Sequence, residues 1–333
     1  MRLSYYILFV VASVLMSCQP VEIDADLPDR DGLITITSLF QTDSLWRVDV
    51  YSSKSILESK AIYGAGAVDL EPITNAQVTL REDGQTYDQL IYSTYKFVVE
   101  SKTYMSSKPE LRPLAGKTYD IEVTVPGVGT ATSACYIPLP VRLLSAKAGR
   151  TVTNVDSRRI NGSSIDHTTF AALATDIVID DPAGENYYEL AVKFYPANGQ
   201  NPYHGPAPGF TKNLRFHNTG INNGSLLPGT DDIYYSIIFS DKDPEAKQMN
   251  LSFMMPTMTN SDQNGIIIED GDRHTVVLRT LSKEYFQYLA SQELQAYSNN
   301  DPFAQPVVIF GNVKGGLGIF AGFSEYEMEV EVE

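Results

Sequence analysis

Few residues of this 333-residue chain have the types and spacing that catalysis or metal binding requires. The histidines stand alone, since none lies three or four positions from another, and no HExxH or CxxC spacing occurs. Acidic residues cluster mainly in turns, but no cluster follows the D-x-D-x-D-G pattern of a calcium loop. No nucleophile motif such as G-x-S-x-G is present. We therefore expect no metal site, no cofactor and no enzymatic activity. Adventitious calcium at the acidic turns and a carboxylate pair assembled in space, as in a hydrolase, are the alternatives.

The thiol with a distinctive context is Cys18, which follows Leu15-Met16-Ser17 at the end of an apolar run. This run, residues 5–16, carries no charge and is shorter than the roughly 20 residues that a membrane-crossing helix needs. With Arg2 before it, it is typical of a secretory signal. Leucine, a spacer and serine directly before cysteine resemble the lipobox of bacterial lipoproteins, in which the chain is cut before a lipidated cysteine. We expect residues 1–17 to be the leader and Cys18 to carry the acyl chains, palmitate among them, that hold the protein at a membrane; the alternative is an ordinary signal peptide.

The other cysteine, Cys135, lies in the apparent strand 132–137. If Cys18 is lipidated, no intramolecular disulfide can form. We expect Cys135 to pack as a small apolar side chain, because a reactive thiol needs a base and electropositive surroundings.

The composition indicates a folded, acidic protein. Hydrophobic residues make up 43% and charged residues 20% of the chain, which is usual for globular proteins. The formal charge is −16, and removal of Arg2 with the leader makes it −17. Such a charge disfavours nucleic acid and anionic lipid head groups as partners, since both attract Lys and Arg. Acyl chains must therefore provide the contact with the membrane.

The first half of the mature chain has the pattern of an antiparallel β-sandwich. Residues 18–30 contain prolines and scattered acids and are expected to form an extended tether. From residue 33 short alternating segments follow, with turns at Asp83-Gly84 and Pro126-Gly127. We expect an immunoglobulin-like or transthyretin-like sandwich over residues 31–140, ending at Pro138-Leu139-Pro140.

The second half, residues 141–333, is expected to be another antiparallel β domain with one amphipathic helix at about 282–297. Strand 175–180 is expected to form a hairpin with 186–194, and strand 234–239 to pair with 249–254. Ser282 is the expected helix cap, and the stripe on residues 286–297 predicts packing against a sheet. Residues 196–232 are rich in Pro, Gly and Asn and form a segment too long for an ordinary connection. Loops of this length are usually functional or mobile.

The glycine-rich segment 311–322 lacks the following helix of a phosphate loop. Its apolar residues alternate with glycines and another strand follows, which predicts tight turns with close backbone packing.

Tyrosine is frequent in this chain, with 20 copies beside one tryptophan, and is the residue type that best indicates a contact surface. The doublets Tyr187-Tyr188 and Tyr234-Tyr235 would each direct one ring outward if they lie in strands. Exposed rings can stack on sugars or anchor a protein partner. These tyrosines are the candidate ligand or partner contacts; the alternative is that a loop or the helix covers the second face.

Several segments follow one another along the chain: the lipobox, the acidic tether, 73–84, 114–119, 138–140, 238–241, 280–289 and 313–322. In this order they resemble the domain-of-unknown-function 4249 (DUF4249) lipoproteins of Bacteroidota. The resemblance implies an extracytoplasmic, lipid-anchored protein, in a family often encoded beside TonB-dependent outer-membrane receptors. Acidic residues soon after the lipidated cysteine resemble a signal for export to the cell surface, although here Gln19 follows Cys18 and the acids are spread out. The family offers no catalytic or ligand residues.

These observations predict an outer-membrane lipoprotein that faces the cell surface, with the periplasmic face as the alternative. We expect a non-enzymatic accessory or ligand-capture partner of a TonB-dependent transporter. The rival hypothesis is a structural or adhesion lipoprotein of the envelope. The sequence does not specify the ligand.

Overall fold

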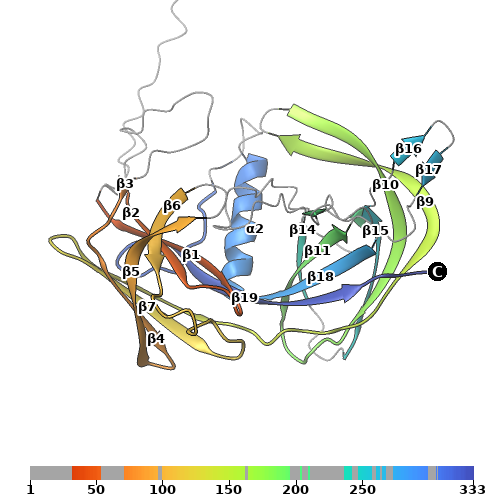
Figure 1. Cartoon of the computed structure of the whole chain (residues 1–333). Helices are drawn as coiled ribbons and strands as arrows, with labels where there is room; N and C mark the ends of the chain where they lie inside the picture. Colours follow the sequence, from red (N-terminus) through yellow and green to blue (C-terminus); the bar gives the residue numbers. More distant parts are fainter. Residues whose placement is uncertain are drawn as a thin grey trace, which may run out of the picture.

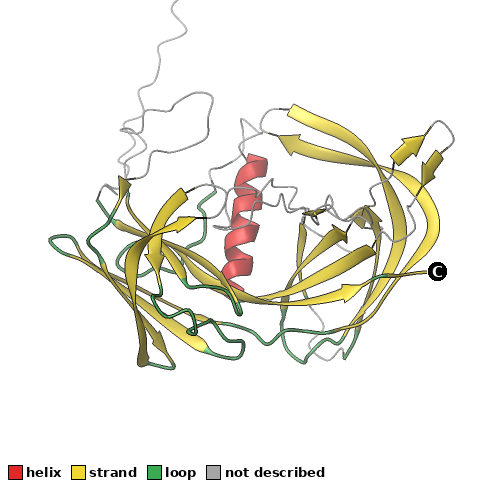
Figure 2. Cartoon of the chain, viewed as in Figure 1, coloured by secondary structure: helices red, strands yellow, loops and turns green. Residues whose placement is uncertain are grey.

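The computed structural model describes residues 32–53, 71–96, 100–161, 164–195, 203–204, 209–210, 236–241, 247–256, 260–262, 265–267, 273–298, 305 and 307–333. The described chain is mostly β, with two large sheets and one helix, α2 (Lys283–Ser298), beside them (Figures 1 and 2). This confirms the expected mostly β fold and is consistent with a sandwich-like arrangement.

The larger sheet has 13 strands and runs through both halves of the chain. Its path is β12-β11-β18-β19-β1-β2-β6-β5-β4-β7-β8, with β14 beside β11 and β3 beside β2. In chain order the strands are β1 (Ile34–Gln41), β2 (Arg47–Ser52), β3 (Glu71–Pro72), β4 (Gln77–Glu82), β5 (Gln85–Lys96), β6 (Glu100–Met105), β7 (Thr118–Val125), β8 (Gly129–Tyr136), β11 (Tyr187–Tyr195), β12 (Tyr203–His204), β14 (Ser236–Ser240), β18 (Arg273–Leu281) and β19 (Leu317–Glu329).

The second sheet has five strands in the order β13-β15-β10-β9-β20. They are β9 (Leu143–Asn161), β10 (Ser164–Ile179), β13 (Gly209–Phe210), β15 (Met249–Pro256) and β20 (Glu331–Val332), and a separate small hairpin joins β16 (Asn260–Asp262) to β17 (Gly265–Ile267). The β9–β10 hairpin is a long curved ribbon on the far side of α2 from β2 and β5 (Figure 1).

Alternation of side chains produces the N-terminal core. Every second residue of β1 and of β7 is buried, as a strand with one face on a core requires. The sheet curls so that Trp46 meets Tyr119 of β7, with ring centroids 4.8 Å apart, and Phe40 of β1 at 4.7 Å. Cys135 of β8 is buried in the same core, as expected.

The predicted turn chemistry is confirmed. Asp83 and Gly84, between β4 and β5, both have positive φ (49° and 81°), which an Asp-Gly hairpin turn tolerates. Gly127 between β7 and β8 has a φ of 79°.

Strand β19 joins the two halves of the molecule. Its first part pairs in parallel with β1, over Thr35↔Leu317 to Gln41↔Phe323. Its second part pairs antiparallel with β18, over Leu281↔Phe323 to Thr275↔Glu329. Ile319, Phe320, Ala321 and Phe323 of β19 pack in the N-terminal core. Val330, directly after β19, belongs to a second core, which includes Leu173 of β10 and Leu190 of β11. The expected boundary at residues 138–140 lies between Ile137 of one core and Val141 of the other, and the domain division stays a prediction.

The glycine-rich segment packs closely against β1, as predicted. A Cβ at Gly316 or Gly318 would overlap the carbonyl oxygens of Ile34 and Ile36 respectively. Glycine lets the backbone of β19 approach β1 here, and φ at Gly318 is 106°.

Two predicted strand pairings are wrong. Strand β10 pairs with β9 and β15 in one sheet, whereas β11 pairs with β18, β14 and β12 in the other. The Asp181-Pro182 connection therefore crosses between sheets instead of closing a hairpin. Likewise, β14 joins β11 and β15 joins β10. The alternation identifies strands, but it does not say which strand is the neighbour.

Helix α2 begins where it was expected. The backbone N–H of Tyr285 donates to Oγ of Ser282 (3.2 Å), which caps the helix. Tyr285 and Leu289 are buried against the N-terminal core, and Phe286 and Ala290 pack beside them. Leu294, which belongs to the predicted stripe, is instead half exposed.

Candidate functional site

The two rings of the Tyr187-Tyr188 doublet lie on opposite faces of β11, and both faces are covered. Tyr188 is fully buried, and its hydroxyl donates to Oδ1 of Asp181 (2.6 Å). Its ring therefore cannot contact a ligand, and this part of the prediction is corrected: the sheet face on which it lies packs into the second core. The ring of Tyr187 packs on Phe286 of α2, 4.8 Å away, so the helix covers the other face.

Several predicted features lie outside the described residues. They are Cys18, Tyr234, Tyr235 and most of the segment 196–232, of which the structure describes residues 203–204 and 209–210. Contact by Tyr187, which is partly buried, also stays a prediction.

The thiol of Cys135 is not activated. Burial raises the pKa of the Cys135 thiol to about 12, so the thiol is protonated at neutral pH. This agrees with a packing role for the residue.

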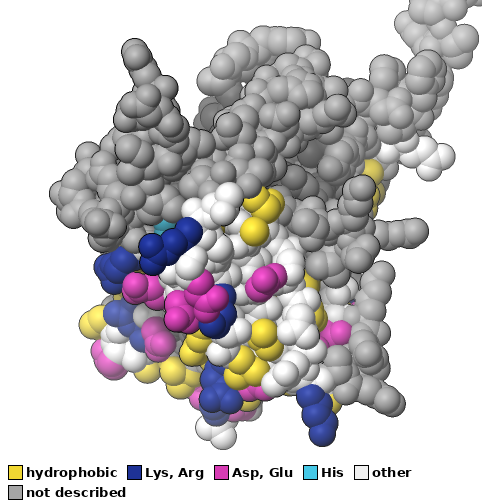
Figure 3. Space-filling model, turned by 90° about the vertical axis from the view of Figure 1, so that its right-hand side faces the viewer, with side chains coloured by type: hydrophobic (Ala, Val, Ile, Leu, Met, Phe, Trp, Pro, Cys, Tyr) yellow, Lys and Arg dark blue, Asp and Glu magenta, His cyan; other side chains and the backbone are white. Residues whose placement is uncertain are grey.

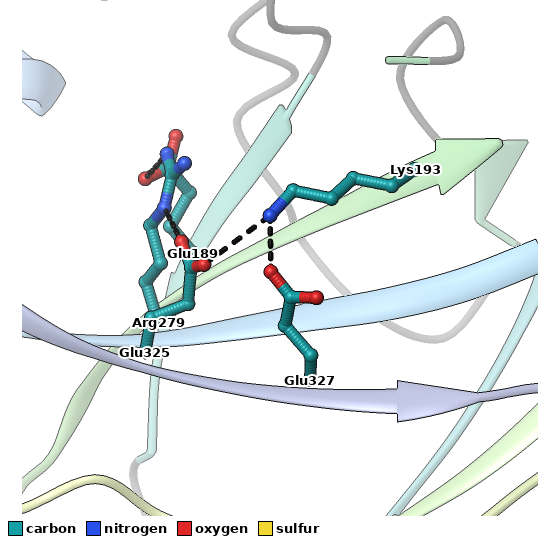
Figure 4. A network of polar contacts seen from close by, with 5 residues as sticks. All are labelled: Glu189, Lys193, Arg279, Glu325 and Glu327. Carbon is teal, nitrogen blue, oxygen red and sulfur yellow. Dashed lines mark hydrogen bonds and ion pairs between the residues drawn. The ribbon is translucent and has the colours of Figure 1, made fainter. Parts of the chain in front are cut away.

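A network of charged side chains crosses β11, β18 and β19 (Figure 4). Glu189, Arg279 and Glu325 lie opposite one another on the three strands, because Arg279 is in register with both glutamates. Arg279 donates through Nη1 to Glu189 (3.0 Å) and through Nε to Glu325 (2.8 Å). Lys193 of β11 reaches Glu325 (3.4 Å) and also pairs with Glu327.

The network is closed to solvent at its centre. The side chain of Arg279 is 3% exposed and that of Glu189 is 5% exposed. The ring of Phe323 lies 4.9 Å from the Arg279 guanidinium carbon, which adds a cation–π contact. Among the described residues seen from the end beyond the C-terminus, acidic and basic side chains lie next to one another on the surface (Figure 3).

Charge pairing dominates the electrostatics of this network. Burial alone would raise the pKa of Glu325, but the charges of Arg279 and Lys193 outweigh it and lower the pKa to about 2. Glu325 is therefore ionised at neutral pH and cannot serve as a general acid there. Because each charge already has an opposite partner, we interpret the network as a clamp that holds three strands together.

An open groove of about 560 Å³ lies at the β8 edge of the larger sheet. Its lining includes Arg81 of β4, Asp120 of β7 and Thr132 of β8. Glu284, in the first turn of α2, and Lys314, before β19, complete its charged lining. Segments far apart in the sequence thus form one surface.

The groove is held together by hydrogen bonds of the backbone and of one amide. Lys314 and Thr132 exchange two backbone hydrogen bonds of 2.8 and 2.9 Å, which extends the sheet by one bridge beyond β8. The Asn312 amide donates to the carbonyl of Phe320 (2.8 Å) and accepts from its N–H (2.9 Å), which fixes the turn before β19. These hydrogen bonds therefore fix the backbone at Lys314.

The charges of the groove are only partly paired. Arg81 forms an ion pair with Glu122 (3.2 Å). Within the part of the chain that the structure describes, neither Asp120 nor Lys314 forms an ion pair or a side-chain hydrogen bond. Glu284 also lacks one there, but the N-terminus of α2 favours its negative charge. Asp120 and Lys314 thus offer opposite charges to whatever enters the groove.

A family model described as Domain of unknown function (DUF4249) matches residues 21–329. The chain belongs to the DUF4249 family. A search of curated proteins finds no match to this DUF4249 chain. Two segments that carried the resemblance, 280–289 and 313–322, supply Glu284 and Lys314 to the groove, and a third, 114–119, ends directly before Asp120.

Sequence reasoning missed the groove of this DUF4249 protein. Asp120 and Lys314 are separated by almost two hundred positions, and no spacing rule links a strand residue to a turn so distant. The available signal was the alternation of β7, which directs Asp120 away from the core.

Among the described residues, no three His, Cys, Asp or Glu side chains gather in a way that could hold a metal ion. The described helix is neither long nor apolar enough to span a membrane.

Proposed function

We propose that this DUF4249 protein is a non-enzymatic lipoprotein, anchored in the outer membrane through Cys18 and facing the cell surface. In this proposal it captures a ligand for a TonB-dependent transporter or otherwise acts as its accessory. The observation that carries the proposal is the groove, which is lined by the half-buried Asp120 and the exposed Lys314; these two residues form no ion pair with each other or with other described residues. The lipobox-like sequence before Cys18 supports the anchor.

The geometry favours binding over catalysis. An acid–base pair needs groups whose pKa values are shifted toward neutrality, usually by burial or by a like charge nearby. In the buried network, opposite charges instead hold Glu325 ionised. The fixed opposite charges of the groove suit recognition of a charged ligand.

A structural or adhesion role is the second candidate, and the β9–β10 hairpin favours it. Residues 154–161 and 164–171 pair, among the described strands, only with each other. The outer edges of such a ribbon carry backbone N–H and C=O groups that can pair with a strand of another chain.

The anchor can be tested by labelling with a palmitate analogue and by fractionation of membranes. Cys18→Ala should abolish the label and release the protein from the membrane fraction. Cys135→Ala is the matched control and should keep both, because this thiol lies in the core. Labelling of Cys18→Ala at the wild-type level would contradict the anchor.

The transporter partnership can be tested by purification of the tagged full-length protein in mild detergent, followed by mass spectrometry. Recovery of one TonB-dependent receptor in stoichiometric amount, lost on deletion of residues 196–232, is the expected result. Recovery of the protein alone, or only as its own oligomer, would contradict the accessory role and favour the structural one.

A further inference from the structure

The groove carries opposite charges on the two sides of β8. Asp120 lies on β7, in register with Ala134, and Lys314 bridges to Thr132 from the other side. Neighbouring strands are about 4.8 Å apart, and Ala134 and Thr132 are two residues, or about 7 Å, apart along β8. The backbones of Asp120 and Lys314 are therefore separated by about 12 Å across β8. Small side chains of β8, Thr132 and Ala134, line the space between them.

These positions select a ligand by its charges and its length. A ligand with an ammonium at one end and a carboxylate at the other would satisfy Asp120 and Lys314 at the same time. An extended peptide spans at most about 3.3–3.6 Å per residue, so three to four residues cover about 12 Å. We propose that the groove binds short zwitterionic peptides, with the ligand's ammonium at Asp120 and its carboxylate at Lys314.

Other charges of the groove agree with this orientation. Arg81, next to Asp120 in register, is paired with Glu122 and does not neutralise Asp120. Glu284 is stabilised by the helix N-terminus. A neutral sugar would leave both Asp120 and Lys314 without a counter-charge, and a simple anion would satisfy Lys314 alone.

The inference deepens the ligand-capture part of the proposed function and rests on it. The test uses calorimetric titration of the full-length lipoprotein in mild detergent with four probes: triglycine, its N-acetylated amide, glycine and maltotriose. Triglycine should bind most tightly, because only it carries both charges at the required separation. Its binding should weaken as salt is added, since the contacts are exposed to solvent. Equal or tighter binding of the capped peptide or of maltotriose, or no triglycine binding at millimolar concentration, would overturn the inference.

Charge variants distinguish the loss of a ligand contact from general damage to the fold. Asp120→Asn and Lys314→Gln should each weaken triglycine binding about fivefold, as expected for loss of one exposed charge contact. Arg142→Gln, which removes an exposed ion pair to Asp180 elsewhere, should leave binding unchanged. Equal effects of all three would overturn the inference.

The double reversal Asp120→Lys with Lys314→Glu is the sharpest variant. Each single reversal should abolish measurable binding, whereas the double variant should restore it, because the peptide can then lie in the opposite direction. A double variant that stays inactive although folded would overturn the assignment of the two charges.

Triglycine titration and receptor recovery test the ligand class and the transporter partnership independently. Absence of triglycine binding together with recovery of a TonB-dependent receptor would overturn the ligand class and leave the accessory role intact. Triglycine binding without a receptor would support the inference and contradict the transporter partnership.

Discussion

The charged network and the groove contain the same residue types, but the charges are paired in the network and partly unpaired in the groove. In the network, Arg279 is buried between two glutamates, and the ion pairs lie along one row of the sheet. In the groove, Asp120 and Lys314 lie on either side of β8 without an ion pair among the described residues. The difference lies in the partners: Arg279 pairs with the glutamates that face it on both adjacent strands, whereas Arg81, which faces Asp120, pairs with Glu122, and β8 separates Asp120 from Lys314. We therefore expect substitutions in the network to affect stability and those in the groove to affect binding.

The largest effect should come from Arg279→Met. The substitution removes the guanidinium that pairs with both Glu189 and Glu325, although Lys193 still reaches Glu325. Removal of one partner of a buried pair costs about 3–5 kcal/mol. The free energy of unfolding, measured by urea denaturation, should fall by this amount. Arg142→Met, at the exposed pair with Asp180, is the control and should change it by less than about 1 kcal/mol. Equal changes would show that the network is not a clamp.

The next largest effect should appear in acid. The pKa of Glu325 is lowered from 4.5 to about 2 in the folded protein. The stabilisation is therefore complete above the unfolded pKa and is lost as the pH falls from about 4.5 through about 2, by about 3 kcal/mol. Urea denaturation between pH 6 and pH 2 should show the difference between wild type and Glu325→Gln shrinking over this window. Glu329→Gln, an exposed residue on the same strand, should not reproduce the trend.

A smaller loss of stability is expected where the groove is anchored. Asn312→Ala removes the amide that fixes the turn before β19 and should lower the free energy of unfolding by about 1–3 kcal/mol. It should also weaken triglycine binding, because Lys314 loses its fixed position. Thermal denaturation and titration of the same sample would check both effects. If neither the stability nor the triglycine binding changed, the Asn312 amide would not be what fixes the turn before β19.

The smallest effect on stability is expected at the groove charges themselves. Asp120→Asn and Lys314→Gln should each change the free energy of unfolding by less than about 0.5 kcal/mol, since exposed unpaired charges contribute little. A double-mutant cycle should give no coupling between them, whereas Arg279 and Glu325 should couple by about 0.5–3 kcal/mol. A coupling of that size between Asp120 and Lys314 would remove the distinction between the two regions.

Local features of the fold could be predicted from the sequence. The alternation of residues 118–125, the Asp83-Gly84 turn and the cap at Ser282 all depend on neighbours within a few positions, and each is found in the structure. The close packing of the glycine-rich segment was also predictable, because glycines alternate with apolar residues before a strand. Residues near in sequence determine these conformations through backbone sterics and local hydrogen bonds.

Strand partners could not be predicted in the same way. The sequence suggested a hairpin of 175–180 with 186–194, yet the two strands lie in different sheets. Likewise, nothing local placed Tyr188 in the second core instead of on the surface. Which face of β11 is covered depends on elements that are distant in the sequence. On the Tyr187 side this element is α2.

The sequence by itself therefore determined the strands, the turns, the helix with its cap, and the acidic character of the chain. The tertiary structure decided that Arg279 pairs with Glu189 and Glu325 and that Asp120 and Lys314 do not pair. The physical reason is that strands pair through backbone groups that are nearly the same in every residue. Side-chain patterns therefore specify which residues face inward, whereas the packing of the whole chain specifies which charges meet.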